Sequence, residues 1–317
     1  MIKIGLIGYG CVAQGFHQLL QGANLNTDIV KVCVKSENKQ RNLDVNLLTT
    51  SLKEFFAHVN YDLVVELISD DVVALDIAKR CEQLGVPLIS ANKKMIAENL
   101  EAINNLKIPF YFEGAVAGSI PIMQTLNNYY KNQEITEVQA ILNGSCNYIL
   151  TDMVRSKISY EEALEKAQTL GFAEENPWLD ISGTDAANKL TILAFQIFSV
   201  SVSVDKIEKE SLESLDREDL LDAHFYENKV KQIARIKRVE GELKLSVMLE
   251  EITPDHPLYF VDDEYNAISL KINGIGNQLL YGKGAGSLPT GLAVLNDLKS
   301  FISEFGGEIL RFDRLSA

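Results

Sequence analysis

The feature of this sequence that most constrains its fold is the alternation of two hydrophobic patterns through the first 125 residues. Short β-branched runs alternate with longer stretches of helical period, an order typical of βαβ units and a parallel sheet. The expected strands cover residues 2–7, 29–34, 63–68, 87–90 and 109–113, and the expected helices cover residues 12–20, 52–57, 72–84 and 99–106. We therefore predict that residues 1–125 form an α/β domain with a Rossmann-type, doubly wound parallel sheet.

The pattern changes after about residue 121, and a chain of 317 residues is long enough for roughly two domains. Strand and helix patterns no longer alternate regularly, which predicts a second, α+β catalytic and dimerisation domain over residues 126–289. Its expected strands cover residues 137–142, 244–250 and 267–273, and its expected helices cover residues 149–155, 160–170, 185–198 and 228–238. A last helix over residues 290–305 predicts that the segment 290–317 returns to the first domain.

Composition excludes several classes of protein. Forty-four acidic residues against 30 basic ones give a net charge of −14, which repels nucleic acid and anionic membranes. The longest apolar runs are much shorter than the roughly 20 residues of a membrane helix, and the N-terminus lacks a signal-cleavage pattern. We expect a cytoplasmic protein that binds neither nucleic acid nor membranes. The four cysteines and four histidines lack the spacing of a disulfide framework or a zinc site.

The turn GYGCVA follows the first expected strand and opens the first expected helix, which is the place of a dinucleotide fingerprint. Gly8 would allow the tight turn, and Gly10 would let the backbone approach a pyrophosphate. Ala13 would allow close helix packing, and the amides of Cys11 and Val12 would meet the phosphate charge. An ordinary glycine turn is the alternative. The position of the motif favours a dinucleotide-binding domain.

The end of the second expected strand bears on the choice of cofactor. Proteins that prefer NAD usually carry an acidic residue there, which binds the ribose hydroxyls. Here the chain offers Lys35, Ser36, Lys39 and Arg41, which could meet a 2′-phosphate, and this favours NADP. Glu37 lies among them and keeps NAD possible. The alternative is an ordinary solvated loop.

Residues 171–190 form an acidic loop that runs into a helix, for which we expect Thr184 to be the N-cap. Asp185 and Lys189 are four residues apart and would share one helix face. A surface ion pair worth a few tenths of a kcal/mol is the alternative reading.

Two further carboxylates, Glu174 and Asp180, precede this helix. Carboxylates can hold a substrate ammonium, and a partly desolvated lysine can pass a proton to or from an oxygen. The loop is therefore a candidate catalytic site.

A second polar cluster covers residues 143–148 and includes Cys146. A thiol nucleophile needs a partner base, and no histidine lies nearby in the sequence. A packing role for Cys146 is favoured, but a thiol-dependent semialdehyde dehydrogenase stays an alternative. A dinucleotide-binding sensor without catalysis is another.

Eight ordered motifs give the chain a specific resemblance to homoserine dehydrogenase along nearly its whole length. The motifs are GYGCVA at Gly8, VVELI at Val64, SANK at Ser90, EGAVAGSIPI at Glu113, ILNGSCNYIL at Ile141, GFAEENPWLDISGTDAANKL at Gly171, HPLYFV at His256 with NAI at Asn266, and GKGAGSLPTGLAVLNDL at Gly282. The resemblance implies NAD(P)-dependent interconversion of L-aspartate 4-semialdehyde and L-homoserine, in the biosynthesis of threonine and methionine. It also implies a homodimer formed through the sheet of the second domain.

The resemblance assigns roles to individual residues. Lys189 would give a proton to the aldehyde oxygen during reduction, while Glu174 and Asp185 would bind the amino and hydroxyl ends of the substrate. Asp180 would support this polar network. Lys93 would lie between cofactor and substrate as a second catalytic or orienting lysine. The protein's own share of the chemistry would then be orientation and proton transfer.

The resemblance further implies a cation site and more of the nucleotide site. Main-chain oxygens would hold a sodium-like ion that fixes the hinge between the domains, at Glu113, Val116, Gly118 and Ile120. Ser69, Gly284 and Gly286 would line the nucleotide.

The chain departs from the family pattern in a few places. Ser69, Asp70 and Asp71 replace a glycine-rich turn and add two carboxylates near the expected nucleotide. Lys35 stands where the family often has arginine, which keeps the charge but not the planar fork. The sequence ends at Ala317, which resembles the short form without a regulatory domain, so we do not expect feedback inhibition by threonine.

Overall fold

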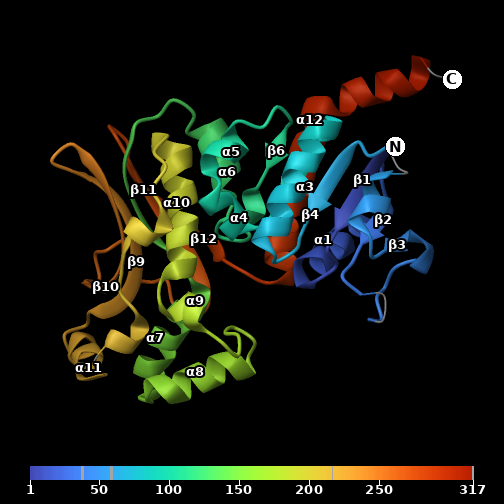
Figure 1. Cartoon of the computed structure of the whole chain (residues 1–317). Coiled ribbons are helices and arrows are strands. Elements are labelled where there is room, and N and C mark those ends of the chain that lie inside the picture. Colours follow the sequence, from blue (N-terminus) through green and yellow to red (C-terminus); the bar gives the residue numbers. More distant parts are fainter. Residues whose placement is uncertain (37–38, 58–59, 216, 316–317) are drawn as a thin grey trace. The chain divides into compact units, whose positions relative to one another are not determined.

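The chain divides into two compact units in a computed structural model that describes residues 1–36, 39–57, 60–215 and 217–315. The first unit contains Met1–Gly118 and Gly286–Ala317, and the second contains Ser119–Ala285. The sequence places these two boundaries slightly later, after residues 125 and 289. Both units are drawn in Figure 1, coloured from blue to red along the chain.

The first unit is built on a parallel sheet in the order β3-β2-β1-β4-β5-β6, which is the Rossmann order. Its strands are β1 Ile2–Ile7, β2 Thr27–Cys33, β3 Leu48–Thr49, β4 Leu63–Glu66, β5 Leu88–Ser90 and β6 Phe110–Tyr111. Its helices are α1 Cys11–Gly22, α2 Leu52–Ala57, α3 Asp71–Leu84, α4 Lys93–Glu98, α5 Leu100–Asn104 and α12 Ser287–Leu315. The predicted doubly wound parallel sheet is confirmed, although the sequence patterns missed β3 and α4.

Helix α12 packs against α1 because small residues let the two helices approach closely. A Cβ on Gly15 would lie 2.1 Å from the carbonyl oxygen of Ser287, and a Cβ on Gly291 would lie 2.5 Å from the backbone nitrogen of Phe16. The Ser287 hydroxyl donates to the carbonyl of Cys11 at 2.7 Å. Apolar side chains of α12 then complete the core formed by the central strands. The C-terminal helix therefore belongs to the first unit.

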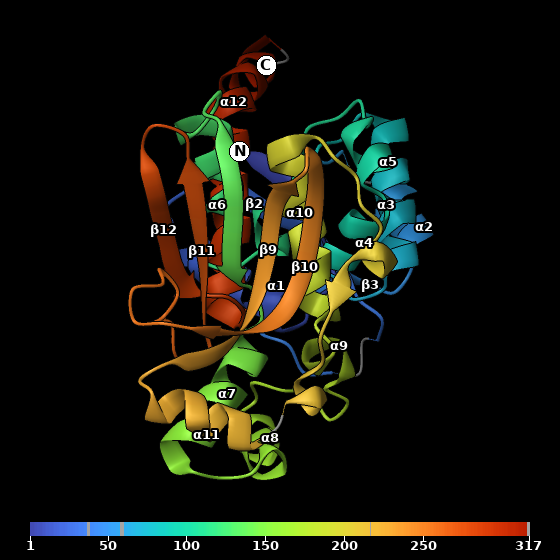
Figure 2. The same ribbon diagram turned by 90° about the vertical axis from the view of Figure 1, so that its left-hand side faces the viewer.

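The second unit contains a mixed sheet in the order β12-β11-β7-β9-β10-β8, seen face-on in Figure 2. Its strands are β7 Ile135–Ile141, β8 Glu208–Lys209, β9 Lys229–Val239, β10 Glu242–Ile252, β11 Tyr265–Ile272 and β12 Gly276–Lys283. Its helices are α6 Ile122–Gln124, α7 Gly144–Ser156, α8 Tyr160–Thr169, α9 Trp178–Ile181, α10 Thr184–Phe198 and α11 Arg217–Phe225. Neighbouring strands are antiparallel except for β8 and β10. The predicted α+β architecture is confirmed.

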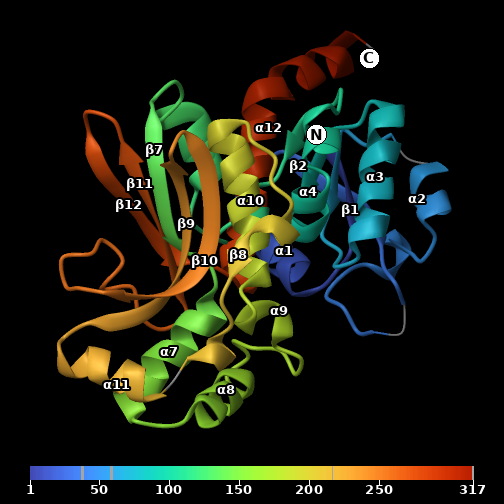
Figure 3. The same ribbon diagram turned by 60° about the vertical axis from the view of Figure 1, so that its left-hand side comes forward.

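Helix α10 lies along one face of this sheet and packs on β9 and β10, as Figure 3 shows. Helices α7, α8 and α11 gather at one end of the same sheet. The strand β7 leads directly into α7 through the loop at Asn143. This loop meets the start of α10, a separate segment of the same unit, because Asn143 donates a hydrogen bond to Asp185.

One prediction for this unit is wrong, because the expected helix over residues 228–238 is replaced by the strand β9, Lys229–Val239. The apolar residues Val230, Ile233 and Ile236 have helical spacing, but β9 is a central strand paired with both β7 and β10. Four consecutive residues of it, 231–234, are buried. A strand covered on both faces loses the two-residue alternation by which strands are usually recognised.

In the part of the chain that the structure describes, no helix combines the length and the apolar character needed to cross a bilayer. Within the same residues, no three histidine, cysteine, aspartate or glutamate side chains gather as ligands for a metal ion.

Candidate active site

The turn between β1 and α1 has the geometry expected of a phosphate-binding turn. Gly8 has a φ of +90°, and a Cβ there would lie 2.6 Å from the carbonyl oxygen of Leu67, so only glycine fits. Apart from Gly10 and its two chain neighbours, no described residue has an atom within 4 Å of a Cβ position at Gly10. The backbone is therefore open to a ligand at the second glycine and closed at the first by Leu67, just after β4.

Helix α1 begins at Cys11, and its N-cap is Gly10, which has no side chain to cap it. The first amides of a helix, here those of Cys11 and Val12, lack partners within the helix and can bind a phosphate. Ala13 is fully buried, as expected of the third small residue in the motif.

The unusual carboxylates after β4 have structural partners in the same unit. Asp70 is the N-cap of α3, where its carboxylate accepts from the amide of Val73 at 2.9 Å. Asp71 pairs with Lys94 at 3.1 Å, and this contact lowers the pKa of the Asp71 carboxyl. Ser69 is exposed just before them. These carboxylates therefore serve the helix terminus and an exposed ion pair.

The loop after β2 is organised by an arginine. The Arg41 guanidinium donates to the carbonyl of Ser36 at 2.6 Å and to that of Lys39 at 3.0 Å. Lys35 is exposed at the end of the strand. Glu37 lies outside the described residues. Arg41 thus contacts the backbone, and Lys35 stays the basic side chain placed at the strand end.

The start of α10 differs by one residue from the prediction. Gly183, not Thr184, is the N-cap, with a φ of +76° that favours glycine. Thr184 is the first helical residue, and its hydroxyl lies 2.9 Å from that of Ser182. The sequence pattern predicted the hydroxyl of Thr184 as the cap, whereas the cap position is a glycine in the left-handed conformation.

Asp185 and Lys189 form a buried ion pair on α10. Lys189 Nζ lies 2.7 Å from Asp185 Oδ2, and the two side chains are only 8% and 5% exposed. Lys189 also donates to the carbonyl of Leu142, at the end of β7, at 2.7 Å. The alternative of a surface ion pair is therefore wrong for these two residues.

Asn143 joins the carboxylates of this cluster. Its Nδ2 donates to Asp180 Oδ1 at 2.7 Å and to Asp185 Oδ2 at 2.9 Å. Its Oδ1 accepts from the amide of Cys146 at 2.9 Å and caps α7. The sequence places Asn143 in a polar cluster without indicating its role. An asparagine between a strand and a helix is a typical N-cap, and that signal could have found it.

A second asparagine shares the carbonyl that holds Lys189. Asn266, on β11, is fully buried and donates through Nδ2 to the oxygen of Leu142 at 3.0 Å. A Cβ on Gly284 would lie 2.1 Å from the Asn266 side chain. Gly284, which the resemblance assigns to the nucleotide, is thus required to be glycine by packing inside the second unit. Gly286, in the first unit, has a φ of +113°.

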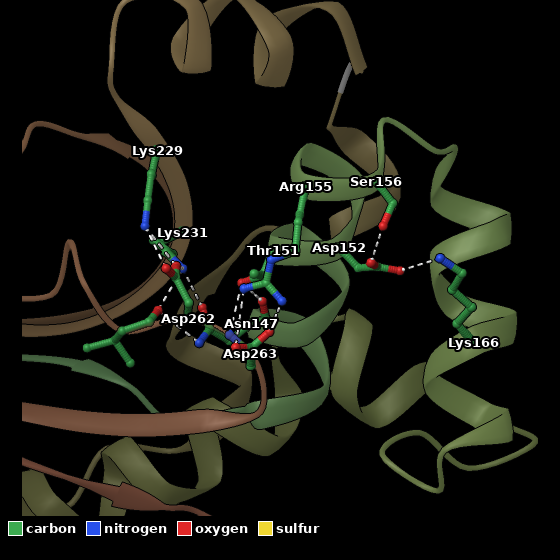
Figure 4. A network of polar contacts seen from close by, with 11 residues as sticks. Asn147, Thr151, Asp152, Arg155, Ser156, Lys166, Lys229, Lys231, Asp262 and Asp263 are labelled. Carbon is green, nitrogen blue, oxygen red and sulfur yellow. Dashed lines mark hydrogen bonds and ion pairs between the residues drawn. The ribbon is translucent and has the colours of Figure 1, made fainter.

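A buried lysine on β9 fixes the segments beside this cluster (Figure 4). Lys231 donates to Asn147 Oδ1, to the carbonyl of Val261 and to Asp262 Oδ1, at 2.9, 2.7 and 2.9 Å. Asn147 in turn donates to the carbonyls of Val261 and Tyr265 at 3.0 and 3.1 Å. Burial lowers the pKa of Lys231, although Asp262 opposes this. The network ties α7 to the loop that enters β11.

Two family models match the chain. The model described as homoserine dehydrogenase matches residues 121–298, more than half of the chain, and the model described as homoserine dehydrogenase, NAD binding domain, matches residues 8–107. The chain belongs to the homoserine dehydrogenase family.

Individual relatives agree with this assignment. The homoserine dehydrogenase of Bacillus subtilis (strain 168) is 32% identical over 311 residues, which cover 94% of this chain and 72% of the relative. The crystal structure of a homoserine dehydrogenase from Thiobacillus denitrificans is 32% identical, with a TM-score of 0.88 over 94% of this chain and 72% of that one. A hyperthermophilic archaeal homoserine dehydrogenase in complex with NADPH shares the fold at 22% identity, with a TM-score of 0.81 over 96% of this chain and 98% of that one.

The family assignment confirms the predicted class of activity. Homoserine dehydrogenases are NAD(P)-dependent oxidoreductases that interconvert L-homoserine and L-aspartate 4-semialdehyde, and this chain is an enzyme of that family.

Glu174 does not join the buried cluster. It is exposed before α9, and its backbone carbonyl accepts from Gln168 Nε2 at 3.0 Å. Among the described residues, none forms a hydrogen bond or ion pair with its carboxylate. The structure therefore places Asp180, Asp185 and Lys189 together, with Glu174 on the exposed side of the same loop. Lys93, in the first unit, is half-buried at the start of α4.

Cys146 lacks the environment of a nucleophile. It is fully buried, and its thiol contacts the carbonyl of Asp180 at 3.2 Å. Burial and the charges of Asp180 and Asp185 raise the pKa of Cys146 well above its ordinary value, opposed only in part by Lys189. The thiol therefore stays protonated at neutral pH, which opposes the thiol-dependent alternative and fits a homoserine dehydrogenase.

The segment implied to hold a cation has a distorted backbone. Two consecutive residues, Ala117 and Gly118, have φ values of +55° and +54°. The carbonyl of Glu113 accepts from the amide of Val116 at 3.4 Å, and that of Ile120 accepts from residue 122 at 2.8 Å. Main-chain oxygens suit a hard cation, and carbonyls keep a second lone pair for one.

Proposed function

We propose that Lys189 is the general acid and base of this homoserine dehydrogenase. The observation that carries the proposal is the position of its ammonium, held at 2.7 Å by both Asp185 Oδ2 and the carbonyl of Leu142 in a nearly dry site. Fixed in this way, Lys189 would donate a proton to the aldehyde oxygen of L-aspartate 4-semialdehyde. In the opposite direction it would take the proton from the hydroxyl of L-homoserine. The nicotinamide, when bound, supplies or accepts the hydride.

The remaining polar groups would bind and orient the substrate. Asp185 would hold Lys189 and contact the reacting end, and Asn143 would keep Asp180 and Asp185 in place through its two short hydrogen bonds. The exposed carboxylate of Glu174 would take the substrate ammonium. We assign Lys93 to orientation of the nicotinamide and substrate, because it opens α4 at the carboxyl edge of the parallel sheet.

The test of this function is the turnover of the Lys189→Ala variant with L-homoserine. We expect kcat to fall by about two to four powers of ten, the usual effect of losing a general acid or base. Nucleotide binding, followed by the fluorescence of the reduced cofactor, should stay as in the parent protein.

The matched control for this test is Lys166→Ala. Lys166 is exposed on α8 and pairs with Asp152 of α7, outside the buried cluster, and this variant should keep the parent turnover. Parent-like turnover of Lys189→Ala would reject the assignment.

We further propose that NADP is the preferred cofactor. Lys35 at the end of β2 is the basic side chain suited to a 2′-phosphate, and the archaeal structure of the same fold is a complex with NADPH. The homoserine assay run in parallel with NADP and NAD ranks the two. A higher kcat/KM with NAD would overturn this preference.

We also propose a homodimer, a sodium-like ion and a biosynthetic role. The edge strand β12 exposes Leu279 and Tyr281 in the sheet through which dimers of the family are expected to form. The main-chain oxygens of Glu113, Val116, Gly118 and Ile120 would hold the ion. The reaction would serve the route to threonine and methionine.

A further inference from the structure

A buried carboxylate lies at the end of β4, outside the groups that the proposed mechanism uses. Glu66 is the last residue of that strand, and its exposure is 0%. Its Oε1 accepts from the amide of Ile68 at 2.7 Å, and its Oε2 accepts from the hydroxyl of Ser90 at 2.5 Å. Glu66 and Ser90 are direct neighbours on the adjacent parallel strands β4 and β5. A buried acid is costly unless it has such partners.

The hydrogen bonds continue from Ser90 to the start of α4. The Ser90 hydroxyl oxygen accepts from the amide of Asn92 at 3.1 Å. Asn92 Oδ1 accepts from the amide of Met95 at 3.0 Å, which caps α4, the helix that opens at Lys93. Glu66 is thus connected to the N-terminus of the helix that carries Lys93.

Asn92 also contacts the turn that follows β4. Asn92 Nδ2 donates to the carbonyls of Ile68 and Asp70 at 3.1 and 3.3 Å. Leu67, which precedes Ile68, packs through its carbonyl against Gly8 of the phosphate-binding turn. One buried acid therefore connects three turns at the carboxyl ends of β1, β4 and β5, the edge at which Rossmann sheets bind dinucleotides.

We propose that Glu66 is a positioning residue of this dehydrogenase, which acts through Ser90 and Asn92 to fix Lys93 and the 67–70 turn beside the bound dinucleotide. The proposal rests on the proposed function, because it assumes that this edge serves hydride transfer. Glu66 itself need not touch the substrate. Its effect is on the placement of groups that do, and misplacement by about 1 Å can cost as much as a hundredfold in rate.

Protonation of Glu66 gives a readout that a packing residue would lack. Burial raises the pKa of Glu66 to about 7, opposed by the hydrogen bonds from Ser90 and Ile68. The charged form accepts both hydrogen bonds, whereas the neutral acid carries a proton on one oxygen, so the Ser90 contact reverses or one of the two hydrogen bonds weakens. Cys81 of α3 is the titratable group whose charge couples to Glu66, and its pKa of about 12 keeps it neutral. Turnover should therefore fall as the pH drops through neutrality.

The test compares Glu66→Gln and Ser90→Ala with a control, Ile77→Val, which removes a methyl group from the buried face of α3 without touching these contacts. Both test variants should lose about tenfold in kcat, while the KM for homoserine changes by less than about threefold and the control stays near the parent. The kcat of Glu66→Gln should also lose the part of its pH dependence near neutrality. Test variants with the kcat and the pH profile of the control would overturn the proposal.

Hydrogen exchange of the Met95 amide gives a second measurement that needs no turnover. Its cap on Asn92 should loosen in Glu66→Gln and Ser90→Ala, so exchange should be faster than in the parent and in Ile77→Val. Unchanged exchange at Met95 would overturn the proposal, even if the parent protein did not act on homoserine. Absence of parent turnover with faster exchange at Met95 would instead reject the proposed function and keep the connection to α4.

Discussion

Asp185 and Glu66 are both buried carboxylates, one in each unit, but they differ in their partners. Asp185 faces the ammonium of Lys189 at 2.7 Å, so two opposite charges are buried together. Glu66 faces a hydroxyl and a backbone amide, which carry no charge. Both acids accept hydrogen bonds, yet only a positive partner offsets the loss of hydration of a full charge.

The difference indicates two ways to use a buried acid beside a reaction. An acid paired with an ammonium is a fixed ion that holds a proton donor in place. An acid with neutral partners can change its charge within the physiological range, since burial raises the pKa of Glu66 to about 7. Lys189 would thus be held by a carboxylate that pairs with its charge, and the start of α4 by a titratable one.

The first prediction removes the charge partner from the buried pair. Asp185→Ala should lower the free energy of unfolding by about 3–5 kcal/mol, because it leaves the ammonium of Lys189 buried without its carboxylate. Urea denaturation followed by circular dichroism measures this change. The double variant with Asp185→Leu and Lys189→Met should recover most of the loss, because no charge is then left buried. A small effect of Asp185→Ala alone would mean that water or another group compensates Lys189.

The second prediction concerns how stability depends on pH through Glu66. Its pKa is about 7 in the folded chain against 4.5 as the ordinary value, so the folded state binds the proton more tightly than the unfolded state. This stabilisation is fully present below about pH 4.5 and is lost as the pH rises through about 7. A difference of about 2.5 units corresponds to roughly 3 kcal/mol.

Measurement of the free energy of unfolding at about pH 5 and about pH 8 checks this sign. Relative to the parent protein, Glu66→Gln should gain stability between the lower and the higher pH. Parallel pH curves for Glu66→Gln and the parent would contradict the contrast between the two acids.

The sequence predicts well the parts of the molecule whose signal is local. The positions of most strands in the first unit, the turn at Gly8 and the four-residue spacing of Asp185 and Lys189 all follow from patterns within a few residues. The partners that give these groups their environment are far away in the sequence. Glu66 and Ser90 are 24 residues apart, and Asn266 is 124 residues from the carbonyl of Leu142.

The same limit explains the failure at β9. A central strand takes its stability from neighbours on both sides, β7 and β10, and none of this is visible within residues 228–238. Lys231 in that strand has the sequence appearance of an exposed cation, yet its three acceptors lie on Asn147, Val261 and Asp262. Burial of a lysine is decided by partners that only the tertiary fold brings together.

The third prediction uses two adjacent carboxylates, Asp262 and Asp263, which Figure 4 shows side by side with different partners. Asp262 accepts from buried Lys231, whereas Asp263 pairs with Arg155 at 2.7 Å, with side chains 59% exposed for Arg155 and 36% for Asp263. Water screens an exposed pair and already solvates both charges, so Arg155→Ala should lower the free energy of unfolding by only about 0.2–1 kcal/mol. Raising the salt concentration should reduce even this difference. The distance between Arg155 and Asp263 equals that between Lys189 and Asp185. If Arg155→Ala lost as much unfolding free energy as is expected for Asp185→Ala, distance and not burial would set the energy of these ion pairs.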